Sequence, residues 1–502
     1  MGKAETLRNV IVIGSGFSGL VSSLLLSRAG MNVTVVEKNV KVAPLLRNYD
    51  YQGFEFNNGF HYLGGYAAGG ALHRMFGELG LRDRLNPVPI NPDAFDVFQG
   101  ICDDPIAVPV GAARVRAVLG KAFPGNEAVL ADYCEELEKA FRDFDFLNLG
   151  EYFIRVDPAL IDRSLADFLA DRGASPALVE FLSVYTDMLL GVSAREVSFL
   201  THLLGVGAYF LSAHTFEGGG GALADALEAQ ARENGVLLRT GWEATRIESD
   251  SGRRFVGLRL RAGDGREEFV PANACICTIH PKRLLALLQD GASFDLFAHR
   301  ISGLQDTRAV CLFHLAVRRD AAQRIVSNYH LFHRNEFGGL QHRFTLLPDF
   351  TRPPGPAASE TRMTALVTAW DNDRGDSCPG GKGPSCQEHA PAGPAGGENK
   401  EPAYLAGFRN RFVARLEEGF PDFREAYQII GITAPCDLDR ISATWNGSLY
   451  GLKCNSSRMR LTPRGPMKGL YLAGQSIIAP GIFGTLVSAC MASRHVLRRR
   501  TA

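Results

Sequence analysis

The residues with the clearest chemical meaning lie near the start of the chain, in the run Gly14-Ser15-Gly16-Phe17-Ser18-Gly19. The first two glycines let the backbone turn sharply and approach an anion, and the third lets a helix pack closely on a strand. The free N–H groups and positive dipole end of the following helix attract phosphate. The run therefore predicts a pyrophosphate-binding turn, to which the Ser15 or Ser18 hydroxyl adds a contact.

An acidic residue follows at the spacing that a dinucleotide site needs. Glu37 lies eighteen residues after Gly19, where a carboxylate accepts hydrogen bonds from both hydroxyls of an adenosine ribose and repels a 2′-phosphate. A tight glycine turn without a ligand is the alternative interpretation. The agreement between the turn, the helix and the acidic partner favours the dinucleotide.

The elements that must position these residues are two parallel strands and the helix between them. Apolar β-branched runs at 9–13 and 32–36 predict the strands, and the leucine pattern that ends at Gly30 predicts the helix. A later cluster, Gly218 to Gly221, follows Thr215-Phe216-Glu217 rather than a β run, so no second dinucleotide site is predicted. An NAD enzyme of this plan needs only the first unit, and a reductase that binds both a flavin and NAD would show a second glycine motif. A single motif in a chain of 502 residues therefore favours FAD over NAD.

The order of patterns predicts an α/β fold with α+β character, in which a Rossmann-like FAD-binding domain is discontinuous. We assign 1–85, 213–290 and 430–502 to this domain. The strand and helix predicted near 469–496 repeat the strand-to-helix pattern found at the start of the chain. Segments 86–212 and 291–429 are assigned to a substrate-binding domain of antiparallel sheet plus helices. Its first segment is mostly helical in pattern, strands are expected at 309–317 and 362–370, and 371–402 is rich in Gly and Pro and is expected to be a flexible loop.

Composition excludes several classes of function. Lys plus Arg and Asp plus Glu number 54 each, so no overall field attracts nucleic acid, and 46% hydrophobic with 22% charged residues is typical of a globular protein. The ten cysteines form neither a disulfide framework nor a zinc pattern, so no metal site is expected and a reducing, cytoplasmic location is indicated. The basic run from Arg494 to Arg500 is either a solvated tail or a peripheral contact with anionic lipid.

Further motifs resemble one family of flavoproteins, the carotenoid desaturases, carotenoid isomerases and retinol saturases within the wider amine-oxidase-like group. The resemblance covers most of the chain and rests on the segments 10–38, 53–63, 218–223, 235–247, 274–281, 447–452 and 469–484. The most specific match is the closing motif, Gly469-Leu470-Tyr471-Leu472-Ala473-Gly474-Gln475 through Pro480-Gly481-Ile482-Phe483-Gly484.

The resemblance implies a set of cofactor-binding residues around FAD. Backbone N–H groups of residues 481–483, which open the last helix, are expected to face N1 and O2 of the flavin, where negative charge gathers on reduction. The full set is Gly14, Ser15, Gly16, Phe17, Ser18, Gly19, Glu37, Lys38, Arg47, Gly59, His61, Ala244, Gly474, Gln475, Gly481, Ile482 and Phe483.

The chain departs from the family pattern at two places. Ala43-Pro44-Leu45 stands where the family has paired glycines and a basic residue, so pyrophosphate or flavin packing there is expected to differ. Gln475-Ser476 stands where the family often has an acidic residue after the last strand. These side chains can still form hydrogen bonds with the ribityl chain of the flavin, but they carry no negative charge.

The flavin would do the redox chemistry, so few catalytic side chains are required. His61 and Tyr62, beside the expected flavin, and Tyr450 are the candidate proton donors or acceptors. For each, the alternative is a structural histidine or a buried ring with a paired hydroxyl.

The density of Leu, Phe and Ala between 181 and 210 predicts either a packed core or the wall of an apolar tunnel. We therefore expect desaturation, saturation or isomerisation of an apolar polyene or isoprenoid-like substrate, with the direction, the electron acceptor or donor and the oligomeric state left open. A flavin amine or amino-acid oxidase and a non-catalytic lipid-binding escort protein on the same fold are the alternatives.

Overall fold

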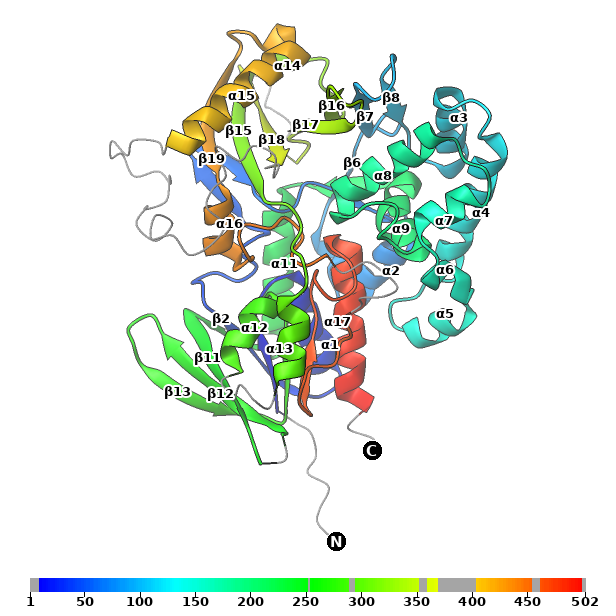
Figure 1. Ribbon diagram of the computed structural model, residues 1–502. Helices are drawn as coiled ribbons and strands as arrows, with labels where there is room; N and C mark the ends of the chain where they lie inside the picture. Colours follow the sequence, from blue (N-terminus) through cyan, green and yellow to red (C-terminus); the bar gives the residue numbers. More distant parts are fainter. Residues whose placement is uncertain are drawn as a thin grey trace.

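The computed structural model describes residues 9–251, 253–288, 294–351, 359–368, 403–453 and 461–498. The segment 371–402, expected to be a flexible loop, lies outside the described residues. The described part contains a parallel sheet flanked by helices, a second sheet beyond it, and a helical region to one side of both (Figure 1).

The first sheet is parallel and has the strand order β10-β2-β1-β14-β20. Its central strand is buried on both faces, as parallel strands covered by other layers usually are. Side chains alternate along β1, so Val10 and Val12 pack into the cluster that contains helix α1, while Ile11 and Ile13 face the antiparallel sheet below. The strands are β1 (Asn9–Ile13), β2 (Asn32–Glu37), β10 (Leu237–Thr240), β14 (Ala274–Cys277) and β20 (Leu470–Leu472).

Two layers cover this sheet. On one face lie α1 (Phe17–Arg28), α11 (Gly219–Glu233) and α17 (Gly481–Arg498), which are packed side by side. On the other face lie α12 (Pro281–Leu287), α13 (Asp295–Ser302) and a three-stranded antiparallel sheet of β11 (Trp242–Ser249), β12 (Phe255–Ala262) and β13 (Glu267–Pro271). The Rossmann-like architecture is therefore confirmed.

The second sheet has seven strands in the order β19-β15-β18-β17-β16-β7-β8. The strands expected at 309–317 and 362–370 are β15 and β18, which pair antiparallel from Val310↔Thr368 to Arg318↔Glu360. Helices α14, α15 and α16 lie on this side of the molecule (Figure 1). The elements are β7 (Asp96–Gln99), β8 (Ile106–Val108), β15 (Val310–Arg318), β16 (Asn328–Arg334), β17 (Leu340–Pro348), β18 (Glu360–Thr368), β19 (Tyr427–Thr433), α14 (Arg319–Ala322), α15 (Ala403–Gly419) and α16 (Pro435–Ser442).

The region 86–212 is mostly helical, as predicted, but its first part is not. Strands β7 and β8 come from it and complete the edge of the second sheet, with β7 parallel to β16. They were missed because runs of four and three residues show too little alternation to read as strands. The helices are α3 (Ala112–Ala122), α4 (Glu127–Arg142), α5 (Leu149–Arg155), α6 (Pro158–Asp162), α7 (Leu165–Ala170), α8 (Pro176–Leu190), α9 (Phe199–His202) and α10 (Ala208–Leu211), with a π-helical turn at Leu203–Gly207.

The residues before the second glycine cluster form a strand, which corrects one sequence interpretation. Ala213–Phe216 is β9, and it pairs antiparallel with β5 (Leu63–Gly64) and with β6 (Pro87–Pro89). Because β9 is antiparallel and lies outside the parallel sheet, the strand and the helix α11 still do not form a second dinucleotide unit. The exact domain boundaries stay a prediction.

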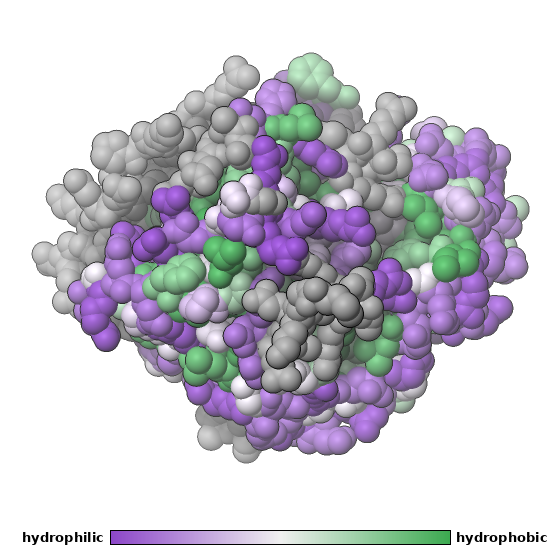
Figure 2. All heavy atoms as spheres, turned by 90° about the horizontal axis from the view of Figure 1, so that it is seen from below, coloured by the Kyte–Doolittle hydropathy of each residue, from purple (hydrophilic) through white to green (hydrophobic). Residues whose placement is uncertain are grey.

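The surface seen from below is largely hydrophilic, with apolar residues in scattered patches (Figure 2). Among the described helices, none is both long and apolar enough to cross a membrane.

Candidate active site

The carboxyl ends of the parallel strands bring the predicted nucleotide residues to one edge of the sheet. The glycine turn follows β1, Glu37 ends β2, Thr278 follows β14 and Gly474 follows β20. Ligands of open α/β sheets bind beyond this edge.

The three glycines of the turn have the distinct geometries that the sequence suggested. Gly14 has φ +93°, and a Cβ there would lie 2.7 Å from Thr278 Oγ1. A Cβ at Gly16, the N-cap of α1, would meet nothing within 4 Å, so the backbone is open to an approaching anion. A Cβ at Gly19 would collide with the carbonyl oxygen of Gly14, so only glycine lets α1 lie this close to the turn.

Glu37 is buried and holds the same turn together. One carboxylate oxygen accepts from the Ser15 N–H (3.0 Å) and hydroxyl (2.6 Å), and the other accepts from the Asn39 N–H (2.9 Å) and side-chain amide (2.6 Å). A carboxylate has about four acceptor positions. The Ser15 hydroxyl and the Asn39 amide therefore occupy two of these positions, and rotating them away would free both for other donors.

A second helix N-terminus faces the same edge. Gly481, the first residue of α17, has φ +74° and open space where a Cβ would lie. Gly474 has φ +117° and donates its N–H to Ser488 of α17 at 2.9 Å. Thr278, which the sequence analysis missed, donates to the carbonyl oxygens of Ile13 (2.8 Å) and Gly14 (3.2 Å) and so ties β14 to the glycine turn.

These observations fit FAD. Two helix N-termini with unobstructed backbone, at Gly16 and Gly481, offer donors to the pyrophosphate and to the flavin, and Glu37 lies where the ribose is expected. Phe17 and Ser18 are buried in the first turn of α1 and shape the same site.

A small cavity lies beside the N-terminus of α17. Its lining residues are mostly of apolar type and come from β5, the end of α8, the π-helical turn, α10 and the start of α17: Leu63, Gly64, Leu189, Leu190, Gly205, Ala208, Tyr209, Pro480, Gly481, Ile482 and Phe483. Residues 481–483, predicted to face the flavin, thus form one wall of a small cavity of about 20 Å³.

Tyr62 contacts a residue that lines this cavity, and His61 precedes it in the chain. The ring of Tyr62 contacts that of Tyr209, with centroids 4.9 Å apart, and its hydroxyl lies 3.2 and 3.3 Å from the carboxylate oxygens of Asp96. Burial lowers the pKa of His61 to about 4, although some of its surface remains accessible, so the imidazole is neutral near pH 7. Burial raises the pKa of Tyr62, and so does the nearby Asp96 carboxylate.

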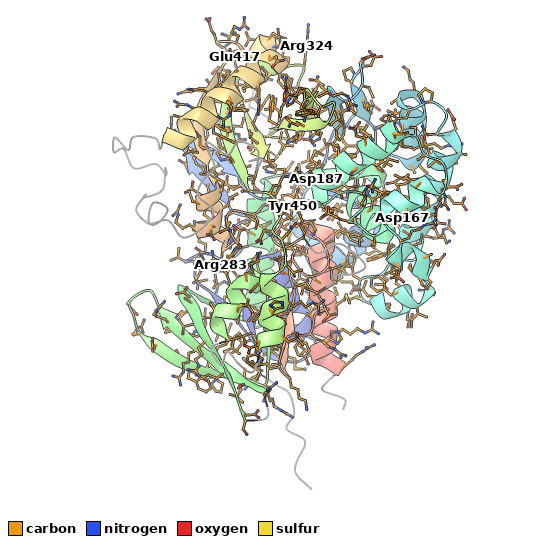
Figure 3. The ribbon with its side chains drawn as sticks, viewed as in Figure 1. Asp167, Asp187, Arg283, Arg324, Glu417 and Tyr450 are labelled. Atoms are coloured by element: carbon orange, nitrogen blue, oxygen red, sulfur yellow. The ribbon has the colours of Figure 1, made fainter. Side chains whose placement is uncertain are left out.

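Tyr450 lies at the centre of the molecule near Asp187 (Figure 3). Its hydroxyl donates to the carbonyl oxygen of Met188, next to the cavity residues Leu189 and Leu190, at 3.0 Å. Burial raises its pKa. Of the three tyrosines Tyr62, Tyr209 and Tyr450, Tyr209 lines the cavity, and Tyr62 contacts its ring.

Four other predicted cofactor residues have contacts within the protein. Arg47 pairs with Asp225 and with Glu228 of α11 (2.6 Å), and Lys38 donates to the carbonyl oxygen of Arg440 (3.0 Å). Gly59 packs against Leu45, and Ala244 pairs with Leu260 in the sheet of β11 to β13. Their roles toward FAD stay predictions.

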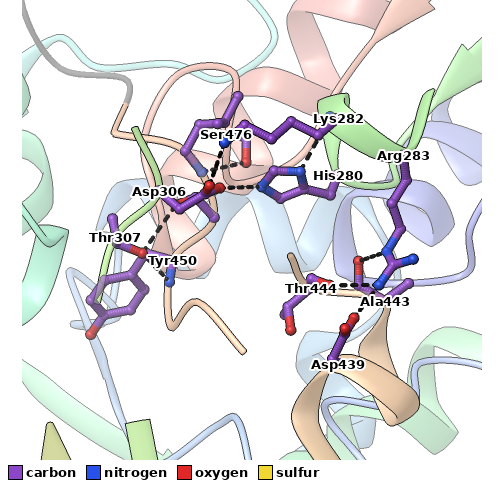
Figure 4. Close-up of polar contacts among 12 residues, drawn as sticks. His280, Lys282, Arg283, Asp306, Thr307, Asp439, Ala443, Thr444, Tyr450 and Ser476 are labelled. Atoms are coloured by element: carbon purple, nitrogen blue, oxygen red, sulfur yellow. Dashed lines mark hydrogen bonds and ion pairs between the residues drawn. The ribbon is translucent and has the colours of Figure 1, made fainter. Parts of the chain in front are cut away.

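The structure describes both places where the sequence departs from the family pattern, at Ala43 and at Ser476. Ala43 has φ +52°, a backbone conformation that glycine adopts more readily, and its N–H donates to Ser15. Ser476 accepts from the Leu452 N–H at 3.1 Å, close to a group in which Asp306 contacts His280 (3.1 Å) and Lys282 (2.5 Å) (Figure 4). An acidic side chain is therefore still present near this turn, supplied by a distant segment.

Comparison with known proteins agrees with this geometry. Residues 17–376 match the family of flavin containing amine oxidoreductases. This match covers more than half of the chain, which therefore belongs to that family and is an FAD-dependent oxidoreductase.

Three relatives and two solved structures are similar to this chain. All-trans-retinol 13,14-reductase from Macaca fascicularis is 24% identical over 98% of this chain and 86% of its own length, and the human enzyme is 23% identical over the same shares. A 4,4′-diapolycopene oxygenase from Methylomonas is 28% identical over 51% of this chain and 53% of its own. Among solved structures, an oxidoreductase from Methanosarcina mazei (TM-score 0.63, 16% identical, covering 98% of this chain and all of that one) and a putrescine oxidase variant (0.62, 14%, 98% of each) share the fold.

Proposed function

We propose that this FAD-dependent oxidoreductase adds, removes or rearranges hydrogen across carbon–carbon bonds of an apolar polyene or isoprenoid-like molecule. The observation that carries the proposal is the small cavity, about 20 Å³, at the N-terminus of α17, whose walls include the apolar side chains of Leu63, Leu190 and Ile482. A ligand there would lie against the helix end expected to face the flavin. The similarity to retinol reductases over 98% of the chain supports the same substrate class.

The flavin supplies the hydride chemistry when bound, and the chain supplies binding, exclusion of water and proton movement. Gly14 to Gly19, Glu37, Gly474, Gln475 and 481–483 would hold the cofactor. Tyr62 is the proposed proton donor or acceptor because it lies beside the cavity and is hydrogen-bonded to a carboxylate. His61 is neutral near pH 7 and Tyr450 donates to a backbone oxygen, so we assign them to orienting the substrate.

Anaerobic spectroscopy of the purified FAD-loaded protein tests this function. Retinoid and carotenoid polyenes should either bleach the oxidised flavin, which means desaturation, or reoxidise the reduced flavin, which means saturation. Primary amines and amino acids serve as the comparison, with hydrogen peroxide measured in air. Reaction with polar amines alone, accompanied by peroxide, would establish the amine-oxidase alternative, and a protein that binds no flavin would establish the escort alternative.

We further propose a peripheral contact with anionic lipid through the C-terminal basic run. Arg494 packs against Gly150 of α5, and the same short helix carries Ile154, whose side chain is 84% exposed. An exposed apolar residue beside basic side chains suits the interface of a lipid bilayer. Flotation with vesicles should show binding that requires anionic lipid and weakens in Ile154→Asp, and equal flotation of neutral vesicles would contradict the charge component.

A further inference from the structure

The cavity at the N-terminus of α17 is too small, in the arrangement described above, for the ligand that the proposed function needs. Its volume of about 20 Å³ is room for about one water molecule. Pockets that enclose drug-sized ligands measure about 300–1,000 Å³. One wall of the cavity must therefore move before a polyene can lie against residues 481–483.

Two of the walls are held by close backbone contacts. Strand β5 lies directly on α10, because a Cβ at Gly64 would come within 2.4 Å of the backbone nitrogen of Tyr209. β5 also pairs with β9, while α17 packs along α1 and is joined to Gly474 through Ser488. Moving either wall would disrupt the sheet pairing or the packing of the nucleotide-binding part of the molecule.

The last turn of α8 forms a different kind of wall. It runs from Asp187, whose side chain is 33% exposed, to Leu190, which is buried and lines the cavity. One helical turn thus reaches from the surface to the cavity. It ends at Gly191, whose φ of +72° is a left-handed conformation that glycine adopts readily. The terminal turn of a helix is also the part that opens most easily.

Side chains of other elements hold this turn in place. Asp187 Oδ2 lies 2.6 Å from Nη1 of Arg308, in the loop before β15. The Tyr450 hydroxyl donates to the carbonyl oxygen of Met188 at 3.0 Å, and the Thr345 hydroxyl adds a long contact of 3.9 Å to Met188 Sδ. An ion pair as exposed as that of Asp187 and Arg308 is weak, so it can hold the turn and still release it.

We propose that the last turn of α8, residues 187–191, is a lid over the cavity, and that the ion pair of Asp187 with Arg308 is its latch. When the turn opens, Leu189 and Leu190 leave the cavity wall, and the enlarged cavity joins the surface beside Arg308. A polyene enters by this route and the turn closes on it. Because the ligand enters only the open form, the strength of the latch sets the rate of entry. This inference rests on the proposed function and assigns the route by which its ligand reaches the site.

Weakening the latch should speed the entry of a polyene. The test uses the FAD-loaded protein and all-trans-retinol, whose fluorescence rises when it leaves water for an apolar site, in anaerobic stopped-flow measurements. Asp187→Asn and Arg308→Gln should each raise the association and dissociation rate constants about two- to fivefold, the factor that an exposed ion pair accounts for, with FAD affinity unchanged. The double variant should match the single variants, because both changes remove the same ion pair.

The matched control is Glu180→Gln, on the same helix about two turns earlier. Glu180 pairs with Arg334 at 2.9 Å, and the two side chains are 35% and 46% exposed, against 33% and 43% for Asp187 and Arg308. Removing this ion pair should leave the association rate constant within about 1.5-fold of wild type. An unchanged rate constant in both Asp187→Asn and Arg308→Gln, or an equal rise in Glu180→Gln, would overturn the proposal.

Hydrogen exchange tests the lid without a ligand. The Gly191 N–H donates to the carbonyl oxygen of Asp187 at 2.8 Å, and its exchange reports opening of the turn. In the FAD-loaded protein its protection factor should fall about two- to fivefold in Asp187→Asn and Arg308→Gln and stay unchanged in Glu180→Gln. Unchanged protection in the latch variants would contradict the lid whatever the substrate proves to be. Reduced protection, with neither retinol nor a carotenoid binding to any variant, would support the lid and contradict the proposed function.

Discussion

Gly16 and Gly19 belong to the same turn but have different structural roles. Gly16 has open space where a side chain would begin, and Gly19 has the backbone of Gly14 there. The open position matters for a ligand that approaches the helix N-terminus, and the closed position matters for packing of α1 against the turn.

Alanine at the two positions should therefore separate binding from folding. Gly16→Ala should leave the thermal midpoint of the apoprotein almost unchanged and weaken FAD binding at least tenfold, because the new methyl group occupies the approach of the pyrophosphate. Gly19→Ala should destabilise the apoprotein by about 1–3 kcal/mol through overpacking. Thermal unfolding and FAD titration measure both, and equal losses of stability in the two variants would contradict this assignment.

The sequence predicts those residues whose chemistry is local. The glycine turn and Glu37 lie within 24 residues of each other, and their spacing alone predicts a nucleotide site. Asp96 and Asn328 are 232 positions apart, and they meet only because β7 joins β16 in the second sheet. The one available signal for Asp96 was an acidic residue inside the apolar run from Ala94 to Phe98.

At the scale of elements, helix α11 is held to the loop after β2 by an arginine. Arg47 pairs with Asp225 and Glu228 and also donates to the carbonyl oxygen of Val42 at 3.0 Å. The resemblance to a flavoprotein family predicted Arg47 at the cofactor, whereas these contacts favour a role in docking the helix.

Arg47→Ala distinguishes the two roles. The pair with Glu228 is largely shielded from water, so the variant should lose about 1–2 kcal/mol of unfolding free energy, measured by denaturant titration of the apoprotein. FAD affinity should stay within threefold. Arg84→Ala is the control, because Arg84 pairs with Glu233 of the same helix at an exposed position, and it should cost less than about 0.5 kcal/mol. If Arg47→Ala had unchanged stability and a large loss of FAD affinity, Arg47 would instead be a cofactor-binding residue.

Elements were predictable where their pattern was long. The βαβ unit and the longer helices α3, α4 and α8 follow from runs of five or more patterned residues. Short strands such as β6, β7 and β9 were missed because their pairing partners lie far away in the sequence, and those partners, rather than local preference, make them strands.

At the scale of the whole molecule, buried neutral histidines should set the pH dependence of stability. Burial lowers the pKa to about 4 in His61 and to about 3 in His202, His314 and His342, from an ordinary 6.5. The unfolded chain then binds protons at a higher pH than the folded chain does, so the stabilisation is complete above pH 6.5 and is lost as pH falls toward 4. The thermal midpoint of the apoprotein should drop between pH 7 and pH 5; a constant or rising midpoint would contradict neutral burial.

The most direct test of the account is an experimental structure of the protein with FAD bound. We predict the pyrophosphate at the backbone of Gly14 to Gly16, the ribose at Glu37 with Ser15 or Asn39 turned aside, and the flavin ring at residues 481–483 beside the cavity of Leu63, Leu190 and Tyr209. A flavin ring bound away from the N-terminus of α17, or one separated from that cavity by protein, would contradict both the site and the function proposed for it.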